Sequence, residues 1–108
     1  MSDDELDRES YYQAAADVWQ RGCRGEDLTD KEALRFLHLA RSRFYTFQLS
    51  ASHAQVQSDG EKIRLLVRGM ALDLSRSPGL ERAWNESEFA DDTFGALVTA
   101  MLDEVRGQ

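Results

Sequence analysis

Apolar residues recur at three- and four-residue intervals along most of the chain, the spacing that places them on one face of an α-helix. The longest run follows a 4-3-4-3 rhythm that is typical of a coiled-coil-like seam. Its members are Ala33, Leu37, Ala40, Phe44, Phe47, Ala51 and Ala54. No segment alternates apolar and polar residues between hairpin turns, as strands of a half-buried sheet would. The pattern therefore predicts an all-α fold.

The first helix is expected over residues 3–21, where Gly22 begins a polar connection. Its start is open, because Ser2 and Ser10 are each followed three residues later by a glutamate or glutamine, which is capping-box spacing. One apolar stripe is expected to face the core. It consists of Tyr12, Ala15, Ala16, Trp19 and Cys23.

The second helix is expected over residues 30–57, between two capping boxes formed by Thr29 with Glu32 and by Ser58 with Glu61. Such a helix would be roughly 42 Å long at about 1.5 Å per residue. Beyond the seam, its first half carries apolar side chains on other faces: Leu34, Phe36, Leu39 and Tyr45. A helix that is apolar on several sides is usually surrounded by neighbours, so we expect this helix at the centre.

Three further helices are expected after the second. The third starts at the Ser58/Glu61 box, a short fourth starts with Ser77 as N-cap and Pro78 at its first position, and the last begins near residues 91–93. Their inward-facing residues are expected to be Ile63, Leu66, Val67, Met70 and Leu74, then Leu80, Ala83 and Trp84, then Phe94, Leu97, Val98, Met101, Leu102 and Val105.

These helices predict a single domain over residues 1–108, an antiparallel bundle of four to five helices with a long central second helix. The neighbouring helices would be shorter than the second. Either the second helix bends near Ser50–Ser52, or part of its seam is left uncovered. In the latter case Ala51 and Ala54 would present a small-residue surface suited to close helix approach, and we hypothesise a homodimer through it.

Composition agrees with one modest core, because 42% of residues are hydrophobic and 9% are aromatic. The apolar runs are short, such as residues 65–67, whereas a membrane span needs about 20 such residues. The N-terminal residues are acidic, unlike a secretory signal. A single cysteine, Cys23, fits a reducing compartment. We therefore expect a soluble cytoplasmic protein that does not associate with a membrane.

Charge is sorted by segment. The net charge of −7 disfavours direct binding to nucleic acid or to an anionic membrane. Residues 1–34 balance at −6, residues 35–82 at +4 and residues 83–108 at −5. One interpretation is that the acidic ends pack beside the basic middle and neutralise it. The alternative is a basic face that meets an acidic partner.

No pattern of catalytic or metal-binding residues is found. His38 and His53 are the only histidines, and 15 residues on one helix would separate them by roughly 22 Å, too far to share a metal. Cys23 has no second cysteine beside it, and no glycine-rich phosphate loop or Gly-x-Ser-x-Gly elbow occurs. We therefore predict a non-enzyme without catalytic residues, cofactor or metal.

A basic and aromatic cluster is the remaining candidate for binding. Arg41, Arg43 and Tyr45 lie close together in the second helix, and Arg64 and Arg68, four residues apart in the third, could face the same side. Such a cluster can bind phosphate or stack on bases, although the favoured interpretation is a solvated face that pairs with the acidic ends. The candidate interaction surface is Arg41, Arg43, Tyr45, Ala51, Ala54, Arg64 and Arg68.

Residues 35–103 combine an aromatic-rich helix containing Arg41, Phe44, Tyr45 and Phe47 with Ser77-Pro78-Gly79-Leu80, Trp84, Phe89, Phe94 and an apolar tail through Val98 and Leu102. This order resembles a group of small bacterial α-helical proteins, a domain of unknown function often found behind a membrane helix. The chain departs from that group in having no membrane helix. The resemblance implies a bacterial origin and carries no activity.

Three functions follow as hypotheses. The first is a non-catalytic helical interaction or regulatory module that binds a protein partner or itself. The second is an acidic mimic of nucleic acid, a phage-type decoy such as an anti-CRISPR, motivated by Asp3, Asp4, Glu5 and Asp7 and by Glu86, Glu88, Asp91 and Asp92. The third is a small-molecule pocket between helices, lined by Trp19, Phe44 and Trp84.

Overall fold

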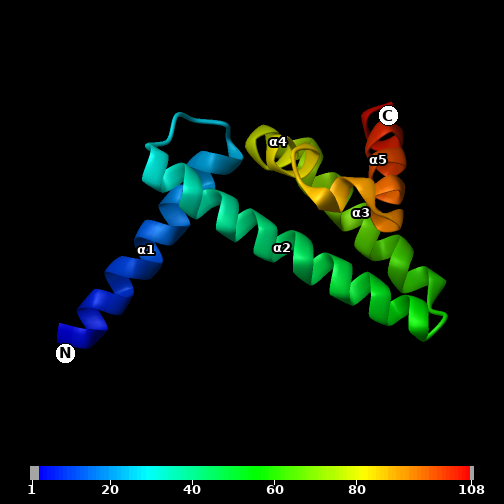
Figure 1. Ribbon diagram of the computed structural model, residues 1–108, viewed down its shortest axis with the longest axis horizontal. Helices are drawn as coiled ribbons and strands as arrows, with labels where there is room; N and C mark the ends of the chain where they lie inside the picture. The colour runs from blue at the N-terminus through cyan, green and yellow to red at the C-terminus, as the bar shows by residue number, and fades with distance from the viewer. Residues whose placement is uncertain (1–2, 108) are drawn as a thin grey trace.

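The computed structural model describes residues 3–107, and the side chains of residues 3–7 and 9 lie outside the described part, as does the alternative helix start at Ser2. The described chain forms five α-helices and one 3₁₀ turn, without strands (Figure 1). The elements are α1 (Asp3–Cys23), α2 (Asp30–Val56), α3 (Gly60–Arg76), α4 (Pro78–Asn85), η1 (Glu88–Asp91) and α5 (Thr93–Arg106). The predicted all-α fold is confirmed.

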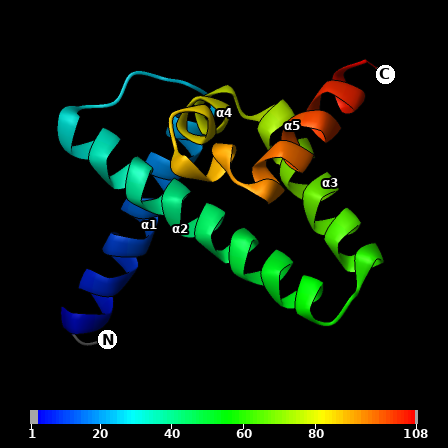
Figure 2. The same cartoon turned by 45° about the vertical axis from the view of Figure 1, so that its right-hand side comes forward.

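The long second helix is central, as predicted. α2 crosses the molecule and packs against α1, α3, α4 and η1. Figures 1 and 2 show α3 returning beside α2, with α4 and α5 on the same side of α2 as α3. α2 is one continuous helix through Ser50–Ser52. Its two ends therefore serve different neighbours, α1 at the start and α3 at the finish.

The start of α2 is fixed by the predicted capping box, which also ties α2 to α1. The Thr29 side chain accepts from the Glu32 backbone N–H, and one Glu32 carboxylate oxygen accepts from the Thr29 N–H at 3.0 Å. The other oxygen accepts from the Arg21 guanidinium of α1, which also binds Asp17 at 2.8 Å. The hydrogen bonds from Arg21 and Thr29 lower the pKa of Glu32 to about 2. The same carboxylates raise the pKa of Arg21.

The turn between α2 and α3 corrects one prediction. Ser58 does not form a capping box with Glu61, because Ser58 adopts a left-handed backbone with φ of 56°. This conformation reverses the chain after α2 and moves the cap one residue along. Asp59 is the N-cap of α3, and its side chain accepts from the Lys62 N–H at 3.1 Å.

The core lies between α2 and the C-terminal helices. On α2 it takes in Phe36, Ala40, Phe44, Phe47, Ala51 and Ala54. The Phe44 ring packs edge-on against Trp84 of α4, with centroids 5.0 Å apart, and against Phe89 of η1 at 6.0 Å. This aromatic cluster joins three elements that lie far apart in sequence.

The start of the predicted seam is wrong, because Ala33 and Leu37 are exposed and Phe36 is buried instead. At its start α2 faces α1 rather than α3. The Phe36 ring contacts Trp19 of α1, with ring centroids 5.5 Å apart. The buried face therefore turns slightly along α2 as the neighbour changes from α1 to α3.

Two other predicted stripes need correction. On α1 the buried positions are Val18 and Gly22, whereas Tyr12 and Ala16 are exposed. On α5 Leu97 is 45% exposed. These residues match helical periodicity, but no neighbouring helix covers their side of α1 or α5. α1 also continues through Gly22 and ends at Cys23, after which Gly25 takes the left-handed conformation with φ of 76°.

α1 is held to α4 by a contact between two glycine backbones. A Cβ placed on Gly79 would lie 1.7 Å from the carbonyl oxygen of Gly22, and one on Gly22 would lie 2.3 Å from the Phe36 ring. Only glycine fits at either place. The C-terminal end of α1 is therefore fixed against both α4 and the start of α2.

We predict that Gly79→Ala destabilises the protein by about 3 kcal/mol or more, at the upper end of overpacking costs, because the obstacle is backbone that cannot rotate away. The matched control is Gly69→Ala in the middle of α3, where an added Cβ meets nothing within 4 Å. That change should stabilise by about 0.5–1 kcal/mol through helix propensity. Urea unfolding measures both. Equal effects of the two substitutions would contradict the glycine contact.

The aromatic cluster predicts that two neighbouring substitutions on α2 have very different effects on the free energy of unfolding. Phe44→Ala should cost roughly 3–5 kcal/mol of unfolding free energy, the usual loss for a buried phenylalanine. Tyr45→Ala, at the next position but 54% exposed, should change stability by about 0.5 kcal/mol or less. Thermal or urea unfolding tests the contrast, and a small loss for Phe44→Ala would mean that the central face of α2 is misplaced.

The lowered pKa of Glu32 predicts that the stability of the protein depends on pH. Its pKa in the folded protein, about 2, lies below the ordinary value of 4.5, so its stabilising effect is present above about pH 4.5 and is lost as the pH falls toward 2. Glu32→Gln should be less stable than wild type at pH 7, and the difference should disappear near pH 2. Urea unfolding at a series of pH values measures it. Glu61→Gln, an exposed carboxylate of α3, is the control; the same pH-dependent difference there would refute the assignment.

Candidate functional site

Two residues of the predicted surface are core residues. Ala51 and Ala54 are both 0% exposed, so the expectation that this part of the seam is left uncovered is wrong. Both lie on the buried face of α2, along the half of the helix that runs beside α3 (Figure 1). Their short side chains fit this close packing within one molecule. These alanines therefore do not form the exposed surface that the predicted homodimer would use, and the homodimer itself stays a prediction.

The structure does not bring the predicted arginines together. Arg41 points toward η1, where it binds Glu88 at 2.5 Å and lies 5.7 Å from the centre of the Phe89 ring. Arg43, two residues on and hence on another side of α2, pairs with Asp73 of α3. Tyr45 is exposed. Arg64 and Arg68 are exposed on α3 without an ion pair in the described chain.

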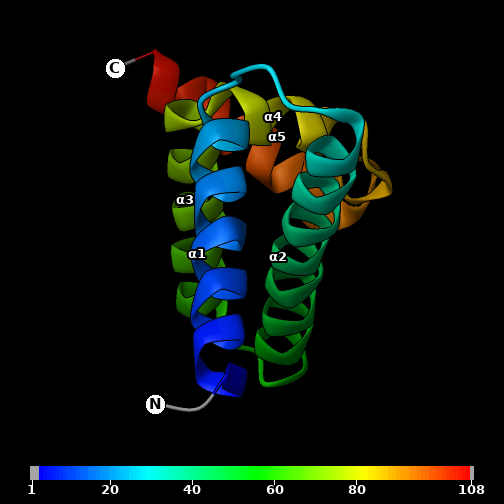
Figure 3. The ribbon, with the colours of Figure 1, turned by 90° about the vertical axis from the view of Figure 1, so that its left-hand side faces the viewer.

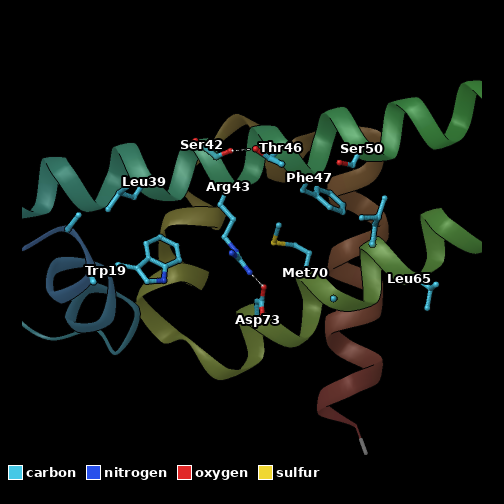
Figure 4. A pocket seen from close by; sticks show the side chains of 14 residues that line it. Trp19, Leu39, Ser42, Arg43, Thr46, Phe47, Ser50, Leu65, Met70 and Asp73 are labelled. Carbon is cyan, nitrogen blue, oxygen red and sulfur yellow. Dashed lines mark hydrogen bonds and ion pairs between the residues drawn. The ribbon is translucent and has the colours of Figure 1, made fainter. Parts of the chain in front are cut away.

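Arg43 instead belongs to a hollow of about 700 Å³ between α1, α2 and α3 (Figure 4), which we call the α1–α3 groove. α1 supplies one wall, α2 the floor and α3 the other wall. The lining residues are Ala15, Ala16, Trp19, Leu39, Ser42, Arg43, Thr46, Phe47, Ser50, Leu65, Leu66, Gly69, Met70 and Asp73.

The α1–α3 groove exists because α1 and α3 pack on different halves of α2. α1 is fixed at its C-terminal end through Gly22 and from there runs away from the body, whereas α3 follows the second half of α2 (Figure 1). In Figure 3 α1 and α3 lie to the same side of α2. The side chains of the floor are short, because Ser42, Thr46 and Ser50 recur there at four-residue intervals. Thr46 donates to the Ser42 carbonyl at 2.9 Å, so its hydroxyl is satisfied within α2.

One ion pair crosses the α1–α3 groove. Arg43 of the floor reaches Asp73 of α3, and its guanidinium carbon lies 6.0 Å from the centre of the Trp19 ring (Figure 4). Around this pair the walls are apolar, with Leu65 63% exposed and Trp19 half-buried. An apolar surface with one satisfied polar group suits recognition of another apolar surface more than chemistry on a bound substrate.

Cys23 lies near this region but has the properties of a structural thiol. Burial raises its pKa, and the hydrogen bond with Ser77 and the charge of Arg43 only partly oppose that effect. The raised pKa keeps the thiol protonated and weakly nucleophilic at neutral pH. Within the described residues, no group of three or more His, Cys, Asp or Glu side chains could hold a metal ion.

The predicted pocket of Trp19, Phe44 and Trp84 is wrong. Only Trp19 lines the α1–α3 groove. Phe44 and Trp84 are fully buried against each other in the core. The sequence places all three on apolar stripes without saying which stripe stays open, and that distinction depends on where α1 leaves α2.

Parts of the second acidic cluster are used within the fold. Glu88 binds Arg41, and Asp92 caps α5 through the Gly95 N–H at 2.7 Å and accepts from Gln48 of α2 at 2.6 Å. Glu88 thus neutralises an arginine of the basic middle segment, as internal neutralisation predicts, and Asp92 caps a helix. The first cluster, Asp3 to Asp7, has side chains outside the described part, so the acidic decoy stays a prediction.

Internal neutralisation holds only in part. The Arg41–Glu88 pair joins the basic middle to the acidic end of the chain. Arg43–Asp73 lies wholly within the middle segment, and Arg106 of the acidic end pairs with Glu81 of the basic middle, opposite to the expected direction. Several basic side chains of α3 are consequently left at the surface.

Comparison with protein-family models, with curated proteins and with solved structures gives no match for this chain. The resemblance over residues 35–103 to small bacterial helical proteins therefore stays a prediction. None of the described helices combines the length and the apolar character needed to cross a membrane. The α1–α3 groove is accordingly the feature of this chain that bears on function.

Proposed function

We propose that the protein is a non-catalytic interaction module that binds a helical segment of a protein in the α1–α3 groove. The observation that carries the proposal is the lining of this groove, which is apolar on both walls and contains a single ion pair, Arg43–Asp73, already formed within the chain. No unpaired charge has to be desolvated when an apolar surface covers it.

The dimensions favour a helix over a compact small molecule. Along α2 the lining extends from Leu39 to Ser50, roughly 16 Å at about 1.5 Å per residue. That length corresponds to about three turns of a bound helix. The small side chains of the floor and Gly69 on α3 allow a helix backbone to approach closely. The groove thus resembles the vacant place of one more helix in the bundle.

A helical-peptide display library tests the proposal. Amphipathic helices selected on the wild-type protein should bind Leu65→Glu at least tenfold more weakly, because a carboxylate would be placed on the apolar wall of the groove. The matched control is Leu97→Glu, which puts the same charge on an exposed leucine of α5 that does not line the groove. Fluorescence anisotropy measures the peptide affinities of the wild type and of both variants. Equal loss of binding in the two variants would contradict the groove as the site.

A further inference from the structure

The N-terminal half of α1 leaves the body of the protein. We call residues 3–14 the α1 arm. Its described side chains at positions 8 and 10–14 are all exposed. Among the described side chains, Arg35 of α2 supports the arm: its guanidinium lies 4.5 Å from the centre of the Tyr11 ring and donates to the Tyr11 carbonyl at 3.4 Å. The arm continues the 21-residue α1, and its described side chains leave their surface open to a partner.

The α1 arm is strongly acidic at its tip. Residues 3–9 contain five carboxylates and one arginine, a balance of −4. Exposed tyrosines, Tyr11 and Tyr12, lie at its base with ring centroids 5.8 Å apart. Aromatic side chains of this kind are enriched where proteins meet. The arm thus combines an acidic end with an aromatic base.

The α1–α3 groove has a basic edge on α3. Lys62 precedes Leu65 by three residues and Gly69 by seven, and Arg76 follows Gly69 by seven, so all four lie along one side of the helix. Both basic residues are exposed and have no ion pair in the part of the chain that the structure describes. They lie near the two ends of the α3 wall, where they complement an acidic helix lying in the groove.

A second hollow of about 700 Å³, between α1 and the start of α2, is less suited to this role. It is lined by four charged side chains, of which Asp17 and Glu32 are bound to Arg21 and Arg35 is bound to Tyr11. Three of its four charged side chains are thus already bound, and the Arg21–Glu32 and Arg35–Tyr11 contacts hold α1 to α2. The α1–α3 groove is the open surface whose charges complement the arm.

We propose that the α1–α3 groove of one molecule receives the α1 arm of a second copy, and that the exchange is reciprocal in a two-fold dimer. The proposal rests on the proposed function and names the helix that occupies the groove. α1 carries the arm and, directly after it, one wall of the groove at Ala15, Ala16 and Trp19. Two α1 helices that cross antiparallel near Ala14–Ala16 therefore bring each arm to the other groove, as an isologous contact requires.

Sedimentation velocity over a wide concentration range, at low and high salt, tests the dimer with full-length protein. We expect a monomer–dimer equilibrium that weakens with salt, because the arm and the α3 edge carry opposite charges, whose attraction salt screens. A wild-type chain that stays monomeric up to millimolar concentration at low salt overturns the proposal. Peptide binding in the groove could then still hold, so the two proposals fail separately.

A charge-swap pair makes the test specific. One variant reverses the arm (Asp3→Lys, Asp4→Lys and Asp7→Lys, which change the balance of residues 3–9 from −4 to +2), and the other reverses the groove edge (Lys62→Glu with Arg76→Glu). Each alone should dimerise at least tenfold more weakly than wild type at low salt. Mixed in equal amounts, the two should form a heterodimer of about wild-type affinity, since both arms then meet an edge of opposite charge.

The matched control is Arg64→Glu with Arg68→Glu, which makes the same charge change on α3 but two and six positions from Lys62, off the side that lines the groove. It should leave dimer affinity within about twofold. Circular dichroism and unfolding midpoints establish that all variants fold. An equal loss in the control, or a mixture of the two reversed variants that stays monomeric, overturns the proposal.

Discussion

Two helices can touch backbone to backbone only where side chains are absent, and α1 meets α4 in this way at Gly22 and Gly79. Because this contact lies at the C-terminal end of α1, that helix is fixed at one end only. The Arg21–Glu32 pair adds a second link at the same end and joins it to the capping box of α2. The direction in which α1 leaves the body follows from these two constraints.

The direction of α1 determines which faces of α2 are covered and which are left open. α2 buries one face against the aromatic cluster of Phe44, Trp84 and Phe89. A second face becomes the floor of the α1–α3 groove, because α1 covers only the first half of α2 and α3 follows the second half. A third face, with Tyr45, is left to solvent. One long helix thus carries the core, the groove and an outer surface at the same time.

Local signals in the sequence predicted the elements well. The box of Thr29 and Glu32 sets the start of α2 because its partners lie three residues apart, and Pro78 starts α4 for a similarly local reason. The predicted capping box of Ser58 and Glu61 does not form, because Ser58 adopts a left-handed backbone after α2. The spacing of capping residues alone does not show backbone handedness. Helix bounds are therefore predictable to within a residue or two where the cap is local.

The candidate site was much less predictable. Periodicity shows which side of a helix is apolar but not which neighbour covers it, so Ala51 and Ala54 were expected at a surface and are core residues. Leu65 and Gly69 lie off the buried stripe of α3, and they line a groove only because α1 diverges from α2. That divergence arises from Gly22 and Gly79, which are 57 residues apart in the chain. No local pattern contains it.

A closed aromatic core lies beside an open groove, and the two tryptophans report on these two places separately. Trp84 is 2% exposed within the core, whereas Trp19 is half-buried on the wall of the α1–α3 groove. Acrylamide quenching of the wild-type protein, at the lowest concentration that gives a signal, measures both. The structure predicts two components of the fluorescence, one quenched and one protected. Protection of both tryptophans would mean that the groove is closed, and quenching of both would mean that the core is open; either result would contradict this account.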